Sequence, residues 1–524
     1  MKDATSSIYN FEKLRKYDYL YIDKTEYVWR LIRRPGEMYF LSRPRRFGKS
    51  LLVSTLKAVF EGKKEMFQGL ALHDKPYDWE KFPVIHIDFA NCDSITPGGL
   101  QKFLEHLLNV SAKVLGLQLR GEEPAVRFEN LMRDAAQSSA TGQVVVLVDE
   151  YDKPILNSLE DLTQCKVLLP LLKGFYASIK KCADIVRLAF ITGVSKFSHV
   201  SLFSELNNLT DITLNPHYAE MLGFTAEEVR EHFAEVITEA AKKFGYSEEK
   251  IMASLLKWYD GYRFSEADTH VCNPVSILKF FNNSYRFSNY WDNTGTPSFL
   301  LNLMRKREEY DLEATLRKWH DERIFAAYEL DKLDITGLLW QTGYLTIKET
   351  LPDDYGLKYR LDFPDMEVQQ TFMDRLLEMY SGDQIQDGLV LVSDFRQALR
   401  RDDLDGFLTM FQSFLAGISY ELHIESEKYY QSIFFVIFKL MGAAIEAESR
   451  MSLGRVDAYV RTEKTVYIFE FKLNRTADEA VGQIIDRHYY EKFRLCGLPV
   501  RLVGVNFDYS RRNITGWKEL PTPE

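Results

Sequence analysis

The residues with the clearest chemical potential lie in one run near the start of the chain, Arg43-Pro44-Arg45-Arg46-Phe47-Gly48-Lys49-Ser50. The run follows a short apolar stretch, and its last three residues open a segment with helical periodicity. Backbone amides at the start of a helix attract phosphate oxygens. We therefore expect the amine of Lys49 to contact the β- and γ-phosphates of a nucleotide, and the Ser50 hydroxyl to bind Mg²⁺.

This run fits the pattern G-x-x-x-x-G-K-[ST] except at its first position, where Arg43 replaces glycine. The first glycine often adopts a backbone conformation that costs other residues energy, so the departure weakens the pattern. Arg45 and Arg46 either face phosphate or are surface charges, and the sequence leaves both alternatives open. The candidate nucleotide-binding residues of the run are Arg45, Arg46, Phe47, Gly48, Lys49 and Ser50.

A second constellation lies downstream, where the apolar residues 144–148 end in Asp149 and Glu150. Asp149 is expected to hold Mg²⁺ through water, and Glu150 to orient or deprotonate the attacking water. Alone, this pattern is more typical of a core strand followed by a solvated turn, but its position after the Gly-Lys-Ser loop favours a nucleotide site. A third apolar strand ends at Thr192, which is expected to sense the γ-phosphate or, alternatively, to cap the strand.

Near the other end of the chain, Asp457, Glu470 and Lys472 could form a different site. Side chains alternate along a strand, so Glu470 and Lys472 share one face while Phe471 takes the other. Two carboxylates suit Mg²⁺ or Mn²⁺, and the carbonyl of Phe471 could add a ligand. Lys472 could position the attacking water and stabilise charge that develops on a phosphate.

The alternative for this strand is an ordinary charge pattern on an exposed sheet. Apolar residues on both of its faces favour a buried central strand instead: Val466, Ile468, Phe469 and Phe471. A glutamate and a lysine on one buried face are costly unless they are paired or used. We therefore favour a functional role for Glu470 and Lys472.

The helix predicted at residues 427–441 carries an apolar stripe with Glu427 at its start. Glu427 is expected either to reach the metal site or to interact with the helix dipole in the first turn. Gln483 and Tyr489, in or near the next helix, are candidates for contact with a substrate phosphate, although a helical glutamine is more often a surface residue.

The elements that must position these residues divide into three regions, 1–215, 216–405 and 406–524. In the first, strands alternate with helices, which predicts an α/β fold with a parallel sheet covered on both faces. The expected strands are residues 38–41, 84–89, 144–148 and 185–191, and the expected helices include 50–60 and 100–115.

The second region reads as mostly helical, typical of a lid and a winged-helix-like module, with a hairpin formed by residues 338–347 and 357–361. The third region predicts the order α-β-β-β-α-β. Its elements are expected at residues 427–441, 444–448, 455–461, 465–473, 477–493 and 500–507.

Composition agrees with a multidomain globular protein. The chain has 524 residues, of which 46% are hydrophobic and 27% charged. The net charge of −10 argues weakly against nucleic acid as a partner, although a local basic groove is compatible with it. Five cysteines without a CxxC pair suggest neither disulfides nor zinc. Without a signal peptide or a bilayer-length apolar run, we expect a cytoplasmic protein with no membrane partner.

Several separate motifs, in order, look like the AAA-ATPase-like family of bacterial proteins. They are Tyr21-Ile22-Asp23-Lys24-Thr25, the run 43–50, Asp149-Glu150-Tyr151-Asp152-Lys153-Pro154 and Phe203-Ser204-Glu205-Leu206-Asn207-Asn208. Arginine at the first loop position resembles a habit of that family. The resemblance implies a P-loop NTPase fold and ATP binding, without implying turnover, and makes residues 21–25 a candidate contributor to the site.

The C-terminal pattern resembles the PD-(D/E)XK nuclease superfamily through Glu427, Asp457, Glu470-Phe471-Lys472 and Gln483, in that order. The resemblance implies a restriction-endonuclease-like domain and metal-dependent cleavage of phosphodiesters. AAA-ATPase-like proteins are often fused to such a domain. DNA is favoured over RNA as the partner.

Three functional hypotheses follow. The first is an ATPase that controls or drives a nuclease with Mg²⁺ or Mn²⁺. The second is an ATP-dependent switch whose C-terminal domain binds nucleic acid or another partner without cleaving, and the third is an ATP-dependent scaffold. Oligomerisation is left open, because the sequence identifies no arginine finger.

Overall fold

The computed structural model describes residues 2–93, 96–159, 161–196, 208–291, 298–306, 312–326, 334–381, 388–418, 427–441, 445–447, 450–451, 454–455 and 458–523. The chain divides into two compact units. The first is Met1–Leu303 with Leu316–Val368, and the second is Met304–Thr315 with Gln369–Glu524. Helix α16 (Met366–Ser381) begins in the first unit and continues into the second. The boundaries at residues 215 and 405 stay predictions.

The first unit contains a five-stranded parallel sheet in the order β2-β3-β4-β1-β5. Its strands are β1 (Glu37–Ser42), β2 (Val84–Asp88), β3 (Val144–Asp149), β4 (Val186–Gly193) and β5 (Leu209–Asp211). The four expected strands and the parallel sheet are confirmed, while β5 was not anticipated. Because β4 lies between β1 and β3, the carboxyl ends of these three strands meet at one edge.

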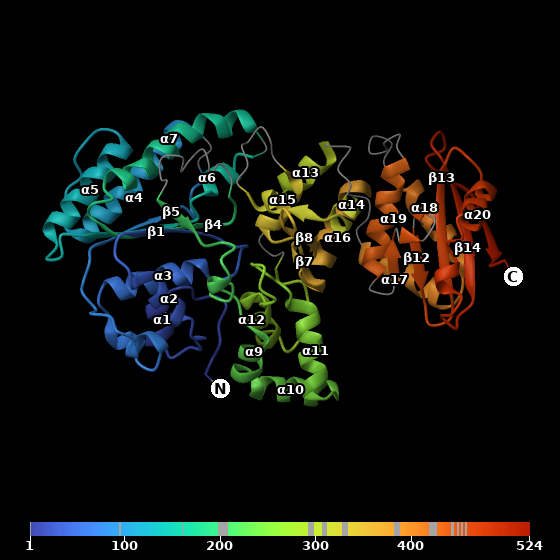
Figure 1. Ribbon diagram of the computed structural model, residues 1–524, viewed down its shortest axis with the longest axis horizontal. Coiled ribbons are helices and arrows are strands. Elements are labelled where there is room, and N and C mark those ends of the chain that lie inside the picture. Colours follow the sequence, from blue (N-terminus) through green and yellow to red (C-terminus); the bar gives the residue numbers. More distant parts are fainter. Residues whose placement is uncertain are drawn as a thin grey trace. The chain divides into compact units, whose positions relative to one another are not determined.

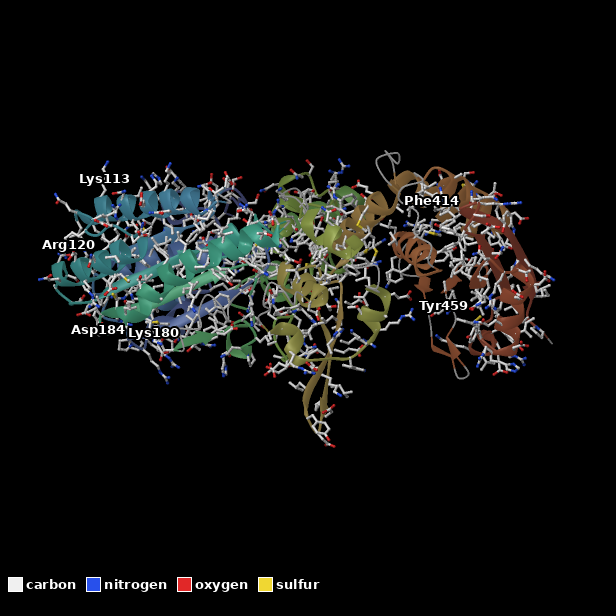
Figure 2. The ribbon with its side chains drawn as sticks, turned by 90° about the horizontal axis from the view of Figure 1, so that it is seen from above. Lys113, Arg120, Lys180, Asp184, Phe414 and Tyr459 are labelled. Atoms are coloured by element: carbon white, nitrogen blue, oxygen red, sulfur yellow. The ribbon has the colours of Figure 1, made fainter. Side chains whose placement is uncertain are left out.

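Helices cover both faces of this sheet (Figure 1). One face carries α1 (Phe11–Lys16), α2 (Thr25–Ile32) and α3 (Lys49–Phe60), and the other α4 (Pro97–Leu115), α5 (Pro124–Ser138) and α7 (Leu162–Lys181). The side chains of Lys113, Arg120, Lys180 and Asp184 project outward at the ends of the latter helices (Figure 2). The doubly covered sheet predicted from the alternating pattern is therefore correct.

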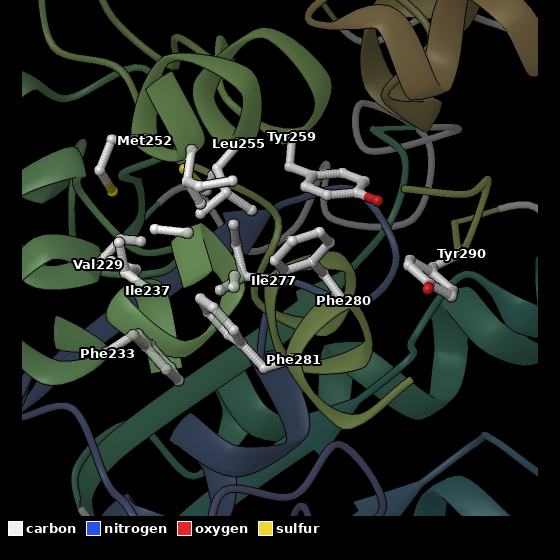
Figure 3. Packing of buried hydrophobic residues seen from close by; sticks show 14 of the residues in the cluster. Val229, Phe233, Ile237, Met252, Leu255, Tyr259, Ile277, Phe280, Phe281 and Tyr290 are labelled. Atoms are coloured by element: carbon white, nitrogen blue, oxygen red, sulfur yellow. The ribbon is translucent and has the colours of Figure 1, made fainter. Parts of the chain in front are cut away.

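A helical region follows in the same unit, with α9 (Ala226–His232), α10 (Ala234–Phe244), α11 (Glu248–Tyr259) and α12 (Pro274–Asn282). Their apolar faces form one cluster (Figure 3), which includes Val229, Phe233, Ile237, Met252, Leu255, Tyr259, Ile277, Phe280, Phe281 and Tyr290. The short helix α6 (Lys153–Leu156) also belongs to this unit, whereas α13 (Ser298–Lys306) and α14 (Leu312–Arg317) each contain residues of both units.

The predicted hairpin is half correct. Strands β7 (Thr346–Asp353) and β8 (Gly356–Asp362) pair antiparallel, with β6 (His320–Asp321) beside β8. The expected first arm was wrong, because residues 338–342 belong to helix α15 (Ile335–Thr342). This helix is buried on all sides, and an apolar run buried on all sides has no periodicity that distinguishes helix from strand. Asp334 caps its start, and Gly343, with φ 91°, ends it.

The second unit contains α17 (Gly388–Arg400), α18 (Leu404–Ala416), α19 (Glu427–Met441) and α20 (Ala477–Asp486) around a five-stranded sheet in the order β15-β14-β13-β12-β9. The strands are β9 (Ile445–Ala447), β12 (Ala458–Arg461), β13 (Val466–Leu473), β14 (Val500–Asp508) and β15 (Asn513–Pro521). Two short strands, β10 (Arg450–Met451) and β11 (Gly454–Arg455), pair with each other. Helices α17, α18 and α19 lie on one side of the five-stranded sheet, and α20 on the other (Figure 1).

The predicted order of elements is confirmed for α19, β9, β12, β13, α20 and β14, and the short pair β10–β11 between β9 and β12 was not predicted. Two further differences concern the helix after β13 and the end of the chain. The helix expected at 477–493 ends at Asp486 and is followed by a short 3₁₀ helix (Glu491–Phe493). The final edge strand β15 was missed. Residues 427–441 were correctly predicted as one helix.

Candidate functional site

The loop between β1 and α3 has the backbone of a phosphate-binding turn. Gly48, the residue before the helix, has φ 88°, a left-handed conformation that favours glycine. Arg46 also has a positive φ of 69°, which is uncommon for a residue with a side chain. The loop therefore holds two left-handed residues immediately before the N-terminus of a helix, where the first amides have no acceptor within the helix.

The amine of Lys49 is buried within this loop. Its Nζ donates hydrogen bonds to the carbonyls of Arg43 and Pro44, both at 2.9 Å. Burial lowers the pKa of Lys49, while the nearby carboxylates of Glu150 and Asp149 oppose that shift. The two acids predicted for the site are therefore close enough to Lys49 to act on its charge.

The structure places Ser50 near Asp149, although the residues lie on α3 and at the end of β3. The Ser50 hydroxyl is close enough to lower the pKa of the Asp149 carboxyl. Burial raises the pKa of Asp149 to about 6, and the nearby Ser50 hydroxyl and Lys49 charge partly offset this shift. A hydroxyl and a carboxylate oxygen are ligands that suit Mg²⁺, so these two residues fit the metal that the sequence implies.

Glu150 follows directly, with a strained backbone at φ 50°. Its amide donates to the Asp149 carboxylate at 3.0 Å, and its side chain is half-buried. This turn separates the two acids, so that Asp149 is buried and Glu150 remains partly accessible to water.

The end of β4 is fixed by a carbonyl of the neighbouring strand β1 and by Asp152, which follows β3. The Thr192 hydroxyl donates to the Leu41 carbonyl at 2.8 Å, which is the strand-capping contact the sequence offered as an alternative. A role of Thr192 in sensing phosphate stays a prediction. Asp152 accepts from the amide and the hydroxyl of Ser195, each at 2.6 Å. A side chain at Gly193 would clash with Asp152 at 2.4 Å, so only glycine fits there.

Arg43, in place of the first glycine, is a fully buried anchor. Its guanidinium donates to the carbonyls of Thr213 at 2.7 Å and Tyr218 at 3.2 Å, and lies 4.2 Å from the ring centre of Phe264. Burial lowers the pKa of Arg43 to about 9. Arg43 does not have a positive φ, so the conformational reason for glycine is absent at this position.

Other side chains of the loop also face the helical region. The ring of Phe47 packs edge-on against Tyr262 at 4.7 Å and Phe264 at 5.3 Å. The Arg46 guanidinium donates to the Tyr290 carbonyl. Arg45 is half-buried and lies near enough to Lys49 to lower the pKa of that amine. Direct contact of Arg45, Arg46 and Phe47 with nucleotide stays a prediction.

The motif at residues 21–25 makes structural contacts. Asp23 accepts from the Thr25 hydroxyl at 2.7 Å and from the Ala71 amide at 2.7 Å. Lys24 forms an ion pair with Glu228 of α9 at 2.6 Å. These contacts connect α2 to the loop at residue 71 and to the helical region.

In the second unit, Glu470, Lys472 and Gln483 come together. Lys472 Nζ donates to Glu470 Oε1 at 3.1 Å, and the Gln483 amide donates to the same oxygen. The Glu470 side chain is 2% exposed and that of Lys472 is 15% exposed. The alternation of side chains on β13 predicted that Glu470 and Lys472 share a face, whereas the bond from Gln483 on α20 to Glu470 was not predicted. Contact of Gln483 with a substrate phosphate stays a prediction.

The opposite face of β13 is apolar, as predicted. The ring of Phe471 lies 4.0 Å from that of Phe434 on α19. Asp457 lies outside the described residues, as does the side chain of Glu427, so their meeting with Glu470 stays a prediction. Among the residues that the structure describes, no three His, Cys, Asp or Glu side chains form a group that could hold a metal.

Helix α20 approaches the sheet closely enough to deliver Gln483 because β14 has a glycine at that point. Gly504 lies opposite Glu470 in the sheet register. A Cβ atom on Gly504 would lie 2.3 Å from the Ala477 carbonyl oxygen and 2.7 Å from Val481. Thr476 and Glu479 form a capping box that begins the helix at this contact. Tyr489, the other candidate near this helix, is buried in the adjoining core.

Sequence reasoning missed three groups that shape the sites. Arg43 was treated as a flaw, and Asp152 was quoted only as part of a motif. Gly504 carried no signal, because its partner is a helix whose position a single sequence does not reveal.

No described helix has the length and apolar character needed to cross a bilayer.

Two family profiles match the chain. One, described as a predicted AAA-ATPase, matches residues 6–203, and the other, described as the PD-(D/E)XK nuclease superfamily, matches residues 425–517. These ranges include the P-loop with β1, β3 and β4 and, at the other end, the Glu470 site.

An uncharacterized protein in the vnfD 5' region of Azotobacter chroococcum mcd 1 is 35% identical over 526 residues, which cover 98% of each chain. A solved structure of the ORC2 protein of Aeropyrum pernix, in ADPNP-ADP complexes, is similar at 10% identity. That match covers 70% of this chain and 91% of the other, but its TM-score of 0.30 is too low to support an argument.

Proposed function

The chain belongs to the AAA-ATPase-like family and carries a C-terminal PD-(D/E)XK nuclease superfamily domain, and we propose that it is an ATPase that controls a metal-dependent nuclease. Its substrates would be ATP and nucleic-acid phosphodiesters, with DNA favoured over RNA. We assign ATP binding to residues 1–215, a lid and winged-helix-like part to 216–405, and the nuclease to 406–524.

The observation that carries the ATPase half is the assembly of Lys49, Ser50 and Asp149 at one edge of the parallel sheet. These residues come from two segments far apart in the sequence, yet a buried amine, a hydroxyl and a carboxylate meet there. A chance Gly-Lys-Ser loop would have no reason to meet an acidic strand end. Ligands of open α/β sheets bind at the carboxyl ends of the strands, which is where this group lies.

Each residue then has a role in the proposed reaction. Lys49 binds the phosphates, and Ser50 and Asp149 hold Mg²⁺, which neutralises phosphate charge when bound. Glu150, half-buried beside them, orients or deprotonates the attacking water. Thr192 is positioned by its bond to Leu41 near the end of β4, where its oxygen can still accept a hydrogen bond.

In the nuclease half, Glu470, Asp457 and Glu427 would hold Mg²⁺ or Mn²⁺, which supplies a Lewis acid for phosphodiester hydrolysis. Lys472, bonded to Glu470, stabilises developing negative charge on the phosphate. Gln483 fixes the orientation of the Glu470 carboxylate through its amide. The chemistry of this donor set, a buried carboxylate joined to an amine, supports the assignment.

Nucleotide binding tests the first half directly. Lys49→Ala is expected to abolish ATP binding measured by calorimetry, and Glu150→Gln to retain binding while losing hydrolysis. Lys57→Ala is a matched control, because Lys57 lies on the same helix and pairs only weakly, at 3.9 Å, with Glu61. Normal ATP binding by the Lys49 variant would refute the P-loop assignment.

A non-cleaving switch is the second candidate, in which the C-terminal domain binds nucleic acid or another partner. The net charge of −10 favours instead a third candidate, an ATP-dependent scaffold with no nucleic-acid partner. ATP would then shift a population of conformers by binding one of them more tightly. Calorimetry with Mn²⁺ separates the candidates. A site lost in Asp457→Ala supports the nuclease, whereas no Asp457-dependent site supports the switch. Binding to nucleic acid that weakens with salt would count against a pure scaffold.

A further inference from the structure

Arg46 connects the P-loop to a distant part of the first unit. Its guanidinium donates to the backbone carbonyl of Tyr290, while its own backbone has φ 69°. A left-handed residue with a side chain persists only where surrounding contacts hold it. The backbone conformation of Arg46 therefore depends on the contacts that fix the backbone at Tyr290.

That backbone is fixed by one buried carboxylate. The amides of Tyr290 and Trp291 both donate to Glu367 Oε1, the latter at 2.7 Å. The hydroxyl of Ser276, in the first turn of α12, donates to Glu367 Oε2 at 2.6 Å. Glu367 is fully buried, with an exposed fraction of 0%.

The other side of Tyr290 is fixed by packing. Its ring belongs to the apolar cluster of the helical region and lies 6.2 Å from the ring of Tyr259 (Figure 3). The Tyr290 hydroxyl also donates to the Arg286 carbonyl at 2.6 Å. With the ring packed and both amides bonded, the carbonyl that receives Arg46 has one defined position.

We infer that Glu367 is a positioning residue of the nucleotide site, which acts through the Tyr290–Trp291 backbone on Arg46 and thereby holds the P-loop in its phosphate-binding conformation. Burying a carboxylate is costly, and these bonds account for its presence. The expected effect of Glu367 on ATP affinity rests on the proposed function, whereas its effect on the backbone of the loop at residues 43–50 does not.

Three substitutions separate this role from general packing. Glu367→Ala removes the acceptor of both amides. Glu367→Gln keeps a side-chain oxygen for them at nearly the same volume, so it should restore the wild-type behaviour. Ser276→Ala is the matched control, because it removes a bond to the same carboxylate but leaves Tyr290 and Trp291 held.

The first measurement is backbone hydrogen exchange in the nucleotide-free protein. In Glu367→Ala we expect exchange at residues 43–50 to be about tenfold faster, and within about threefold of wild type in the other two variants. Unchanged exchange at residues 144–149 of β3 will show that the core is intact. Should the alanine variant lose that protection, Glu367→Asp, which retracts the carboxylate, serves in its place. Wild-type exchange at residues 43–50 would overturn the inference.

The second measurement is ATP affinity in a double-mutant cycle. Glu367→Ala and Arg46→Ala should each raise the Kd by about tenfold, and the double variant should raise it no further, because both changes break one connection. Multiplied effects would overturn the inference. Absence of ATP binding by the wild-type chain would count against the proposed function instead, while the exchange experiment would still decide the role of Glu367.

Discussion

Gly504→Ala should displace helix α20 and loosen the Glu470 site. The new Cβ would lie 2.3 Å from the Ala477 carbonyl oxygen and 2.8 Å from the Val481 amide nitrogen, both backbone atoms of the helix. An ordinary carbon–oxygen contact needs roughly 3.3 Å, so the helix must retreat by about 1 Å. Overpacking of this kind costs about 1–3 kcal/mol. Because α20 carries Gln483, the same movement weakens its bond to Glu470.

The matched control is Gly482→Ala, one residue before Gln483. A Cβ at Gly482 meets nothing within 4 Å, and its φ is not positive. Replacing a glycine within a helix by alanine should therefore stabilise α20 by about 0.5–1 kcal/mol. The substitution of glycine by alanine is thus expected to displace α20 at Gly504 and to stabilise α20 at Gly482.

Hydrogen exchange of residues 477–486 is the assay, because it reports on α20 itself in a chain with two compact units. A loss of about 2 kcal/mol in Gly504→Ala corresponds to roughly thirtyfold faster exchange. Gly482→Ala should slow exchange. Equal protection in both variants would refute the close approach of α20 to β14.

Two further predictions concern the first unit. Arg43→Gly restores the usual glycine, yet we expect it to destabilise the unit by about 3 kcal/mol or more. The reason is that the carbonyls of Thr213 and Tyr218 lose a charged donor. A thermal melting temperature at or above that of the wild-type protein would contradict this prediction. Burial raises the pKa of Glu367 from 4.5 to about 7. Between these two pH values the folded state holds a proton that the unfolded state has released. The free energy of unfolding should therefore fall as pH rises from about 4.5 to 7, by up to about 3 kcal/mol. Glu367→Gln should remove this part of the decline in urea midpoints and leave the parts due to other buried acids such as Asp365 and Asp149, whose pKa values burial also raises. An unaltered pH profile would disprove the prediction.

The central parts of both sites were predictable because local patterns determine them. A buried run that ends in Asp149-Glu150 predicts a strand that places its two acids at one end, and a Gly-Lys-Ser loop predicts the start of a helix. Alternation on β13 placed Glu470 and Lys472 together without knowledge of the neighbouring strands.

The remaining features depend on contacts between distant segments. Arg43 and Glu367 act through backbone carbonyls and amides, which any residue type offers, so no sequence pattern marks their partners. Residues 513–521 escaped prediction because an edge strand carries polar side chains and lacks an apolar run. Helix α15 was misread for another reason: all of its residues are buried, so it shows no contrast between an apolar and an exposed face.

The most direct test of the account is cleavage of labelled DNA and RNA by the purified chain, in Mg²⁺ or Mn²⁺, with and without ATP. The wild-type protein should cut in the presence of metal, Glu470→Ala should not cut, and Lys49→Ala should lose the response to ATP while retaining the metal site. Undiminished cutting by Glu470→Ala would contradict the nuclease assignment, and identical cutting with and without ATP in the wild-type protein would contradict its control by the nucleotide.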